Sequence, residues 1–243
     1  MNSQERRIKK PIWKELILHS DEYYTIINKP AGISTLDDRA SDIDILKLAR
    51  AENPEATPCH RLDKETSGVL VIANHSEAYK YFASKLEKRE VKKVYHAVVN
   101  GIHSFHDFEA SESLNSTGSK TRVDRSGKAS LTLIQTLEVF KRHTLLKCFP
   151  FSGRMHQIRV HLAHHGAPLV SDGLYGGEAA YLSTLKRNFK LGKFDEEQPM
   201  IRRMALHAAS ITFVHPESEE SVQVDAPYPK DFEVLVKQLR KFK

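Results

Sequence analysis

Cysteine is scarce in this sequence, which has two in 243 residues, Cys59 and Cys148, with no close pair. A secreted domain held by disulfides needs more cysteines at recurrent spacings. We therefore expect a reduced protein of the cytoplasm. Cys59 adjoins a charged segment described below, and we expect it to serve as a small packed side chain.

Long apolar runs are also lacking. No segment approaches the roughly 20 apolar residues that a membrane helix needs. The N-terminal residues 1–14 are basic but have no apolar signal core behind them, which argues against secretion. The sequence shows no internal repeat and no linker-like change of composition. We expect no membrane association, and a single domain over residues 15–243 behind a basic tail at 1–14.

Negative charge is in the minority. Lysine and arginine number 37 against 31 acidic residues, which gives a net charge of +6. This excess favours a polyanionic partner such as nucleic acid, although moderate basicity is also common in proteins that bind none. Otherwise 40% hydrophobic and 28% charged residues are ordinary globular usage, with enough length for a sizeable core.

The most informative segment is residues 60–68, with the sequence HRLDKETSG, followed by the apolar residues 69–73. One aspartate, Asp63, lies among His60, Arg61 and Lys64, just before a probable buried strand. A carboxylate in this company gains from opposite charge, and it can attack carbon, take a proton or hold a cation. The alternative is a salt-bridged surface turn, the commoner fate of such an aspartate.

A second charged segment, residues 152–166, is SGRMHQIRVHLAHHG. Apolar side chains recur at helical spacing, so we expect a helix over 154–165, with Ser152 as N-cap and Gly166 at the C′ position. Arg154 and Arg159 fall in its first part. Arginine near a helix N-terminus is unfavourable for the helix dipole unless it pairs with a carboxylate or phosphate, which indicates a functional site.

Five ordered segments resemble motifs of the RluA-type RNA pseudouridine synthases. They are residues 28–32 (NKPAG), 60–68 (HRLDKETSG), 93–101 (KVYHAVVNG), 153–166 (GRMHQIRVHLAHHG) and 206–208 (LHA), with APYP and Asp231-Phe232 further on. Each motif alone is a modest signal, but the ordered set is specific and extends from about residue 16 to 235. The chain departs from the family at Ser171 before Asp172, where the family more often has glycine.

The resemblance implies an α+β protein with the pseudouridine synthase fold, a mixed, mainly antiparallel sheet with flanking helices and a central catalytic cleft. The family's S4-type RNA-binding domain is expected to be missing, because few residues precede the first expected strand at Leu16. Sequence patterns predict other helices over 42–50 (capped by Ser41 or Asp42), 76–88 and 229–242, and a helix and basic loop within 178–199. They predict strands over 16–18, 23–28, 69–73, 92–99, 129–140, 144–150, 204–214 and 221–224.

The implied reaction breaks the C1′–N1 bond of uridine and rejoins the same base through C5. It needs an anionic group beside C1′, a dry pocket and a group that moves protons. Asp63 resembles the family's essential aspartate, acting either on C1′ or through loss of the 2′ proton. Tyr95 resembles the tyrosine that stacks on the target base, although a mid-strand aromatic more often only packs in a core. Arg154 resembles the arginine that pairs with the aspartate.

The expected RNA contacts surround these catalytic residues. By resemblance, Arg61 fills the gap left by the extruded nucleotide and stacks on its neighbours, while its alternative role is phosphate contact. His60, Lys64 and Arg159 complete the predicted RNA-binding set, with His60 also orienting the loop. The RNA is transfer RNA or large-subunit ribosomal RNA, and the loops at 103–128 and 178–200 are expected to choose the target.

The four histidines of the 152–166 segment raise the question of zinc, because His spaced three or four apart on a helix can chelate metal. No cysteine joins them and no HExxH is present, so we expect neither metal nor cofactor. Two rival functions remain: a catalytically silent RNA-binding protein using the same basic cleft, and a hydrolase with an aspartate nucleophile. A monomer is the expected state.

Overall fold

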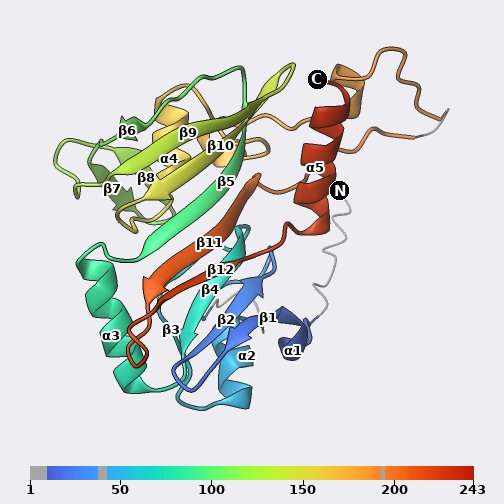
Figure 1. Cartoon of the computed structure of the whole chain (residues 1–243). Coiled ribbons are helices and arrows are strands. Elements are labelled where there is room, and N and C mark those ends of the chain that lie inside the picture. Colours follow the sequence, from blue (N-terminus) through green and yellow to red (C-terminus); the bar gives the residue numbers. More distant parts are fainter. Residues whose placement is uncertain (1–9, 38–42, 193–194) are drawn as a thin grey trace.

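The computed structural model describes residues 10–37, 43–192 and 195–243. Their main sheet has ten strands in the order β1-β2-β4-β11-β5-β10-β9-β6, with β12 added to β11 and β3 to β4 (Figure 1). The strands are β1 (Ile17–Ser20), β2 (Tyr24–Lys29), β3 (Thr57–Pro58), β4 (Ser67–Ala73), β5 (Lys92–Asn100), β6 (Phe108–Ala110), β9 (Thr132–Val139), β10 (His143–Pro150), β11 (Leu206–Val214) and β12 (Ser221–Asp225).

All strand pairings in this sheet are antiparallel except one. β4 and β11 run parallel and pair only through His207 with Ser67 and Ala208 with Gly68. Gly68 has φ +117°, and a Cβ there would lie 2.1 Å from the carbonyl oxygen of Ala208, so only glycine fits. The expected α+β class with a mixed, mainly antiparallel sheet is therefore confirmed.

Helices cover both faces of the sheet, because neighbouring strand residues point to opposite sides. On β5, Ala97 and Val99 pack with α4 (Gln157–His164), whereas Val98 packs with α5 (Lys230–Lys241). On β4, Leu70 and Ile72 pack with α2 (Ile45–Glu52), whereas Val69 and Val71 pack with α3 (Ser76–Glu87). Tyr95 contacts both the α2 and the α4 clusters, so these helices cover the same face of the sheet on either side of Tyr95.

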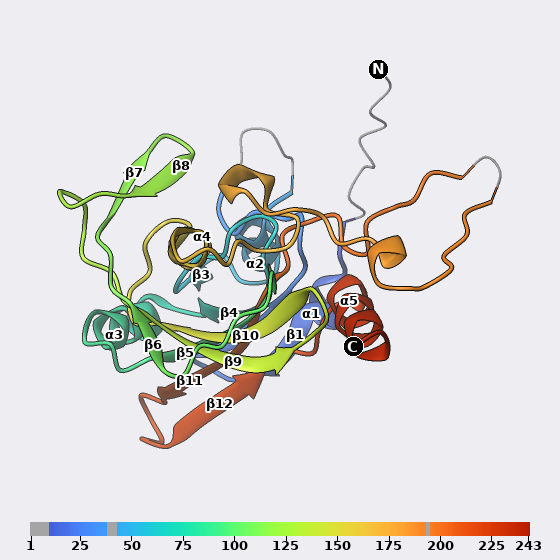
Figure 2. The same cartoon turned by 90° about the horizontal axis from the view of Figure 1, so that it is seen from above.

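A short hairpin stands over the same face. It consists of β7 (Leu114–Thr117) and β8 (Lys120–Val123), and Figure 2 shows it projecting beyond α4. The region 103–128, which was expected to hold loops that choose the target, forms this hairpin together with the short sheet strand β6. The hairpin contacts α4 through β8.

Three local predictions were wrong. Residues 178–199 form no α-helix among the described positions, only the 3-10 turn Leu182–Thr184, because few of their side chains are buried. The expected caps Ser41 and Asp42 lie outside the described residues, and α2 is capped instead by Asp44, which accepts from Lys47 N. The strand predicted from Leu16 begins one residue later, at Ile17, because Leu16 is the last residue of the short helix α1 (Trp13–Leu16).

Candidate active site

Asp63 lies in the loop between β3 and β4, and the NKPAG turn (residues 28–32) makes hydrogen bonds to the backbone of this loop. Gly32 N donates to the carbonyl oxygen of Lys64 at 2.8 Å. The buried Lys29 ammonium donates to the same oxygen at 3.1 Å and to the carbonyls of Pro30 and Ile33. Burial lowers the pKa of Lys29 to about 7. The motif at residues 28–32 thus fixes the backbone beside Asp63.

Side-chain and backbone hydrogen bonds also clamp both ends of the loop. Thr35 Oγ1 accepts from Leu62 N at 3.1 Å and donates to Leu62 O at 2.9 Å. On the other end, Thr66 N donates to Asp63 O at 3.0 Å, which closes a tight turn before Gly68 and the buried strand β4. Because the backbone is held on both sides, the Asp63 side chain has a defined direction.

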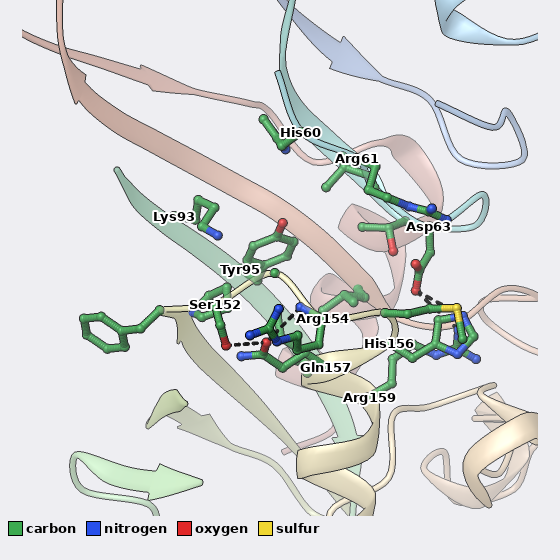
Figure 3. A pocket seen from close by; sticks show the side chains of 18 of the residues that line it. His60, Arg61, Asp63, Lys93, Tyr95, Ser152, Arg154, His156, Gln157 and Arg159 are labelled. Carbon is green, nitrogen blue, oxygen red and sulfur yellow. Dashed lines mark hydrogen bonds and ion pairs between the residues drawn. The ribbon is translucent and has the colours of Figure 1, made fainter. Parts of the chain in front are cut away.

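The carboxylate of Asp63 points toward the N-terminal end of α4 (Figure 3). Its Oδ2 lies 3.3 Å from Arg159 Nη1 and 3.8 Å from His156 Nε2. Arg159 also makes two bonds to Asp172, at 2.7 Å through Nε and 2.8 Å through Nη2. Arg159 and Asp172 are both buried, so this bidentate pair compensates charges removed from water.

Tyr95 and Lys93 come from β5 and line the floor of the pocket (Figure 3). Burial, and secondarily the charge of Asp63, raises the pKa of the Tyr95 phenol, which therefore keeps its proton at neutral pH. Burial lowers the pKa of the Lys93 ammonium to about 8. The cavity that these residues share with Asp63 has a volume of about 430 Å³, which is in the range of small-molecule and nucleotide sites.

Cations lie at the mouth of this cavity. The side chains of Arg61 and Arg154 line it and are exposed. Arg154 makes one weak side-chain hydrogen bond, from Nε to the carbonyl oxygen of Ala129 at 3.4 Å. A cavity with one anchored carboxylate inside and cations outside suits a polyanion that inserts one group.

The RNA pseudouridylate synthase family matches residues 23–164 of this chain. The chain belongs to this family. Its sequence is 33% identical to a ribosomal large subunit pseudouridine synthase C of Buchnera aphidicola subsp. Baizongia pistaciae, over 94% of this chain and 71% of the relative. It is 36% identical to a ribosomal large subunit pseudouridine synthase D of Xanthomonas campestris pv. campestris, over 92% of this chain and 69% of the relative.

Solved structures agree with the sequence comparison. Human RNA Pseudouridylate Synthase Domain Containing 4 superposes with a TM-score of 0.72 at 24% identity, covering 93% of this chain and 95% of that one. Human RNA Pseudouridylate Synthase Domain Containing 1 gives 0.65 at 26% identity, covering 92% and 94%. The predicted pseudouridine synthase fold is therefore confirmed, and the enzyme is an isomerase that makes pseudouridine in RNA.

The expected pairing of Arg154 with Asp63 was wrong, because Arg159 occupies that position. The helix was predicted from residue 154, but α4 begins at Gln157. Arg159 is then in the first helical turn, where side chains point back toward the N-terminus and into the cavity. Arg154 precedes the helix and lines the cavity without an ion pair to Asp63. The expectation that a first-turn arginine needs an acidic partner is confirmed, but at Arg159.

The start of the helix explains this shift. His156 has φ +54°, a left-handed conformation that no helical residue can have, so the helix cannot begin before it. Ser152 was predicted as N-cap, but its Oγ donates to Gln157 Oε1 at 2.7 Å instead. At the other end Gly166 follows the C-cap His165 with φ +73°, which confirms its predicted C′ position.

Other predicted site residues lie close to the pocket. His60 lines it, and its Nε2 accepts from Val71 N at 3.2 Å, which suits its expected role in orienting the loop. Burial lowers the pKa of His60 to about 3, so its ring stays neutral. Lys64 is exposed and does not line the cavity. The buried Arg159 is engaged by two carboxylates, which leaves it poorly suited to the RNA contact predicted for it.

Sequence reasoning missed the roles of Asp172 and Tyr175. Ser171 precedes Asp172, at the position where the family more often has glycine. In the structure Ser171 has φ +62°, a conformation that favours glycine, and its Oγ donates to Ile201 O at 2.8 Å. The turn presents Asp172 to Arg159. The sequence signal for this role was an acidic residue, Asp172, directly after Ser171, whose position more often holds glycine in the family.

The four histidines of this segment do not converge on one point, although the rings of His164 and His165 contact each other. His156 contacts Tyr175, His161 contacts Ser130 and Thr132, His165 contacts Glu112, and His164 is exposed. Across the described ranges, no group of three or more His, Cys, Asp or Glu side chains is arranged to hold a metal ion. Within those same ranges, no helix has the length and apolar character needed to span a membrane.

Proposed function

We propose that this enzyme isomerises uridine in large-subunit ribosomal RNA, with Asp63 as the group that acts on the ribose. The observation that supports this role is the geometry of its carboxylate. Arg159 and His156 both contact Oδ2 of Asp63. Among the described residues, no side chain makes a hydrogen bond or ion pair with Oδ1. One oxygen is thus anchored while the other is available to a substrate in the cavity.

The reaction conserves all atoms of the nucleotide. The C1′–N1 bond breaks, the freed uracil turns within the cavity, and C5 bonds to C1′. N1 gains a proton and C5 loses one, so the site must retain the base and move a proton. Oδ1 of Asp63 either adds to C1′ or removes the 2′ proton in the first step. Both routes need an oriented carboxylate shielded from water.

Tyr95 is proposed to stack on the target base and to assist proton transfer. Its ring lies on the floor of the cavity, and its raised pKa keeps the hydroxyl protonated. Replacing Tyr95 with Phe retains the ring and removes only the hydroxyl. If turnover falls while RNA affinity is kept, the hydroxyl takes part in the reaction. If turnover is kept, the ring acts by stacking alone.

The choice of RNA is supported by the relatives, which are named for the ribosomal large subunit. We expect purified enzyme to form pseudouridine in unmodified large-subunit rRNA without added cofactor, detected by mass spectrometry of nuclease digests. Transcripts of tRNA assayed in parallel decide between the two RNA classes. Binding of RNA without product would instead support the catalytically silent alternative. Size-exclusion chromatography with light scattering tests the expected monomer.

Replacing Asp63 with Asn tests its role directly. We expect product formation to fall by at least about 10³-fold, equivalent to about 4 kcal/mol of barrier, with RNA affinity retained. The matched control is Glu65→Gln, because Glu65 is in the same loop but exposed and outside the cavity lining. Turnover by the Asp63 variant at the wild-type rate would refute the proposal.

A further inference from the structure

Three groups from distant segments form a hydrogen-bonded chain behind Asp63. The backbone N–H of Thr121, in strand β8, donates to the hydroxyl of Tyr175 at 2.9 Å. That hydroxyl lies 2.7 Å from His156 Nδ1, and His156 Nε2 lies 3.8 Å from Asp63 Oδ2. The β7–β8 hairpin is therefore connected to the catalytic carboxylate through two side chains.

The direction of these hydrogen bonds determines where the protons are. A backbone N–H can only donate, so the Tyr175 oxygen accepts from Thr121 and its own proton is free to be donated to His156 Nδ1. With Nδ1 as acceptor, a neutral imidazole has its proton on Nε2, the nitrogen that faces Asp63. In the other tautomer Nδ1 would donate to an oxygen that already accepts from Thr121 N, and the phenol proton would have to turn to the Thr121 side chain.

Two further features fix this chain in place. His156 has φ +54°, an unfavourable conformation for a residue with a side chain, and such strain concentrates at functional sites. The guanidinium of Arg159 lies over the Tyr175 ring, 4.8 Å from its centre. Tyr175 thus supports both groups that contact Asp63 Oδ2, one through its hydroxyl and the other through its ring.

We propose that Tyr175 and His156 are positioning residues that aim the Asp63 carboxylate, and that the seating of the β7–β8 hairpin controls this alignment. The inference rests on the proposed role of Asp63. In the aligned state His156 Nε2, which lies 3.8 Å from Oδ2 in this structure, closes to hydrogen-bond distance and donates to Oδ2, which directs Oδ1 into the cavity. Tyr175 holds His156 in the required tautomer, and the hydrogen bond from Thr121 holds Tyr175.

The hairpin is suited to respond to RNA. The side chain of Thr121 is buried, whereas its neighbours Lys120 and Arg122 are exposed, and the hairpin projects from the face that holds the cavity (Figure 2). An RNA backbone that contacts these cations would hold the hairpin against Tyr175. Substrate docking and carboxylate alignment would then be parts of one equilibrium.

Tyr175→Phe is the direct test, because it removes the hydroxyl and retains the ring under Arg159. We expect kcat to fall about tenfold, the size expected for one lost hydrogen bond, with KM within about twofold of wild type. Thermal unfolding checks that the variant is folded. A purely structural tyrosine would lower the unfolding temperature without this separation of kcat from KM.

The pH profile gives a second readout. Burial lowers the pKa of His156, and the charge of Asp63 opposes this shift. Tyr175→Phe removes a donor to the neutral ring, so the pKa of His156 rises and the acid limb of kcat moves to higher pH. The charged or titratable groups that face His156 are Asp63, Arg61, Arg159, Asp172 and Tyr175, and all but the last are unchanged in this variant.

A pair of His156 variants provides the matched control. His156→Gln retains an N–H donor near the position of Nε2, whereas His156→Leu has similar size and no donor. Both share the same unfavourable backbone conformation, so the difference between them reports the donor alone. We expect the Gln variant to retain at least about fivefold more activity, consistent with one hydrogen bond. Hydrogen exchange of residues 114–123 should be faster in Tyr175→Phe than in wild type.

The outcomes separate this proposal from the function on which it rests. If wild-type enzyme makes no pseudouridine, or Asp63→Asn retains turnover, the proposed role of Asp63 fails. If wild type is active and folded Tyr175→Phe matches it in kcat and pH profile, the positioning chain alone is refuted. Equal activity of His156→Gln and His156→Leu would also refute it. Unchanged exchange in the hairpin would refute the coupling to β8.

A basic groove far from the catalytic cavity carries an independent inference. It lies between the β9–β10 turn, the end of α5 and the segment after η2 (Leu182–Thr184), which Figure 1 shows close together. No acidic side chain lines it, and Phe140 and Leu185 are buried beneath it. Its cations are Lys141, Lys186, Arg187, Lys241 and Lys243.

Neighbouring carboxylates neutralise little of this charge. Glu138 pairs with Arg240 at 2.9 Å and with Lys243 at 3.5 Å. Lys141, Lys186, Arg187 and Lys241 have no acidic partner among the described residues. We infer that this groove binds the phosphodiester backbone of RNA outside the target nucleotide, because charge complementarity fits a polyanion and because the enzyme's substrate is RNA.

The test compares two triple variants of equal charge. Lys186, Arg187 and Lys241 are replaced with Gln in one, and the exposed Lys14, Lys80 and Lys88 in the other. We expect only the groove variant to lower affinity for long RNA, with its salt slope reduced by about 2, from roughly 0.7 per phosphate contact. Activity on a short hairpin should be retained. Equal effects of the two triples, or no effect of the first, would overturn the inference.

Discussion

Two walls of the catalytic cavity use their charged side chains differently. On the inner wall, Arg159, Asp172 and Asp63 are largely buried and bond to one another at 2.7 to 3.3 Å. On the outer wall, Arg61 and Arg154 are exposed, and the only side-chain hydrogen bond recorded for either within the described residues is a long one from Arg154 to a carbonyl. The inner wall holds the Asp63 carboxylate in place, and the outer wall leaves its cations available to a substrate.

This difference has an energetic reason. Buried charges must be paired, because an isolated one would lose its hydration without compensation, so the inner wall is rigid. Exposed arginines are hydrated and gain little from internal pairs. They can exchange water for phosphate or a base at small cost. Removing a residue from each wall should therefore affect different properties of the enzyme.

The largest effect is expected from Arg159→Met on the inner wall. It leaves the buried Asp172 and the neighbouring Asp63 without their cation, so the free energy of unfolding should fall by about 3–5 kcal/mol. Urea denaturation measures this loss, and activity should disappear with it. The matched variant Arg154→Met should lose less than about 1 kcal/mol. Similar losses at both positions would show that the two walls do not differ.

The outer wall is tested by Arg61→Ala and Arg61→Lys. If Arg61 fills the gap left by an extruded base, both variants should lose about tenfold or more in turnover on folded RNA, because lysine lacks the planar guanidinium. A single-stranded oligonucleotide, with no stack to disrupt, should be modified almost normally. If Arg61 only contacts phosphate, the lysine variant should behave as wild type on both substrates. Stability should be unchanged in all cases.

We expect Lys93, which also lines the cavity, to make RNA binding dependent on pH. Burial lowers the pKa of its ammonium from the ordinary 10.5 to about 8, so the charge is present below that pH and is lost as pH rises through it. Between pH 7 and 9, the loss of this charge should lower RNA affinity a few-fold, in addition to any effect of other groups that titrate in this range. Lys93→Arg retains its charge throughout and should abolish this part of the profile. An identical profile in the variant would contradict the prediction.

The smallest effect is expected from Ser171→Gly, in the turn that presents Asp172. Glycine removes the strain of a left-handed serine, about 1 kcal/mol, but also the hydrogen bond to Ile201, worth about the same. The free energy of unfolding should change by less than about 1 kcal/mol, as measured by urea denaturation. A large loss would mean that the serine hydroxyl, rather than the backbone, holds Asp172 in place.

Much of the fold could be predicted from local patterns. The strands β2, β4, β5 and β10 follow runs of apolar and β-branched residues, and α5 follows a regular apolar spacing. The helix expected over 178–199 was wrong because spacing alone does not show whether a face has anything to pack against. Only Ala180 and Leu185 of residues 178–199 are deeply buried within the described positions.

The candidate site was likewise predicted in part: its motif residues were identified, but one of their contacts was not. The residues Asp63 and Tyr95 were identified from their motifs, and the structure places both at one cavity. The partner of Asp63 was assigned to Arg154, five residues too early, because the sequence did not show that the left-handed His156 delays the start of α4. A shift of that size turns a side chain of a helix from one face to another.

The sequence alone determined most of the strands and helices, since these follow from local spacing, and its motifs determined the family. Only the tertiary structure decided that Arg159 pairs with Asp63 and that Asp172 neutralises Arg159. It also decided that Tyr175 and His156 lie behind the Asp63 carboxylate. Arg159 and Asp63 are 96 residues apart in the chain. Contacts of this kind depend on how the sheet brings loops together, and no local pattern records that geometry.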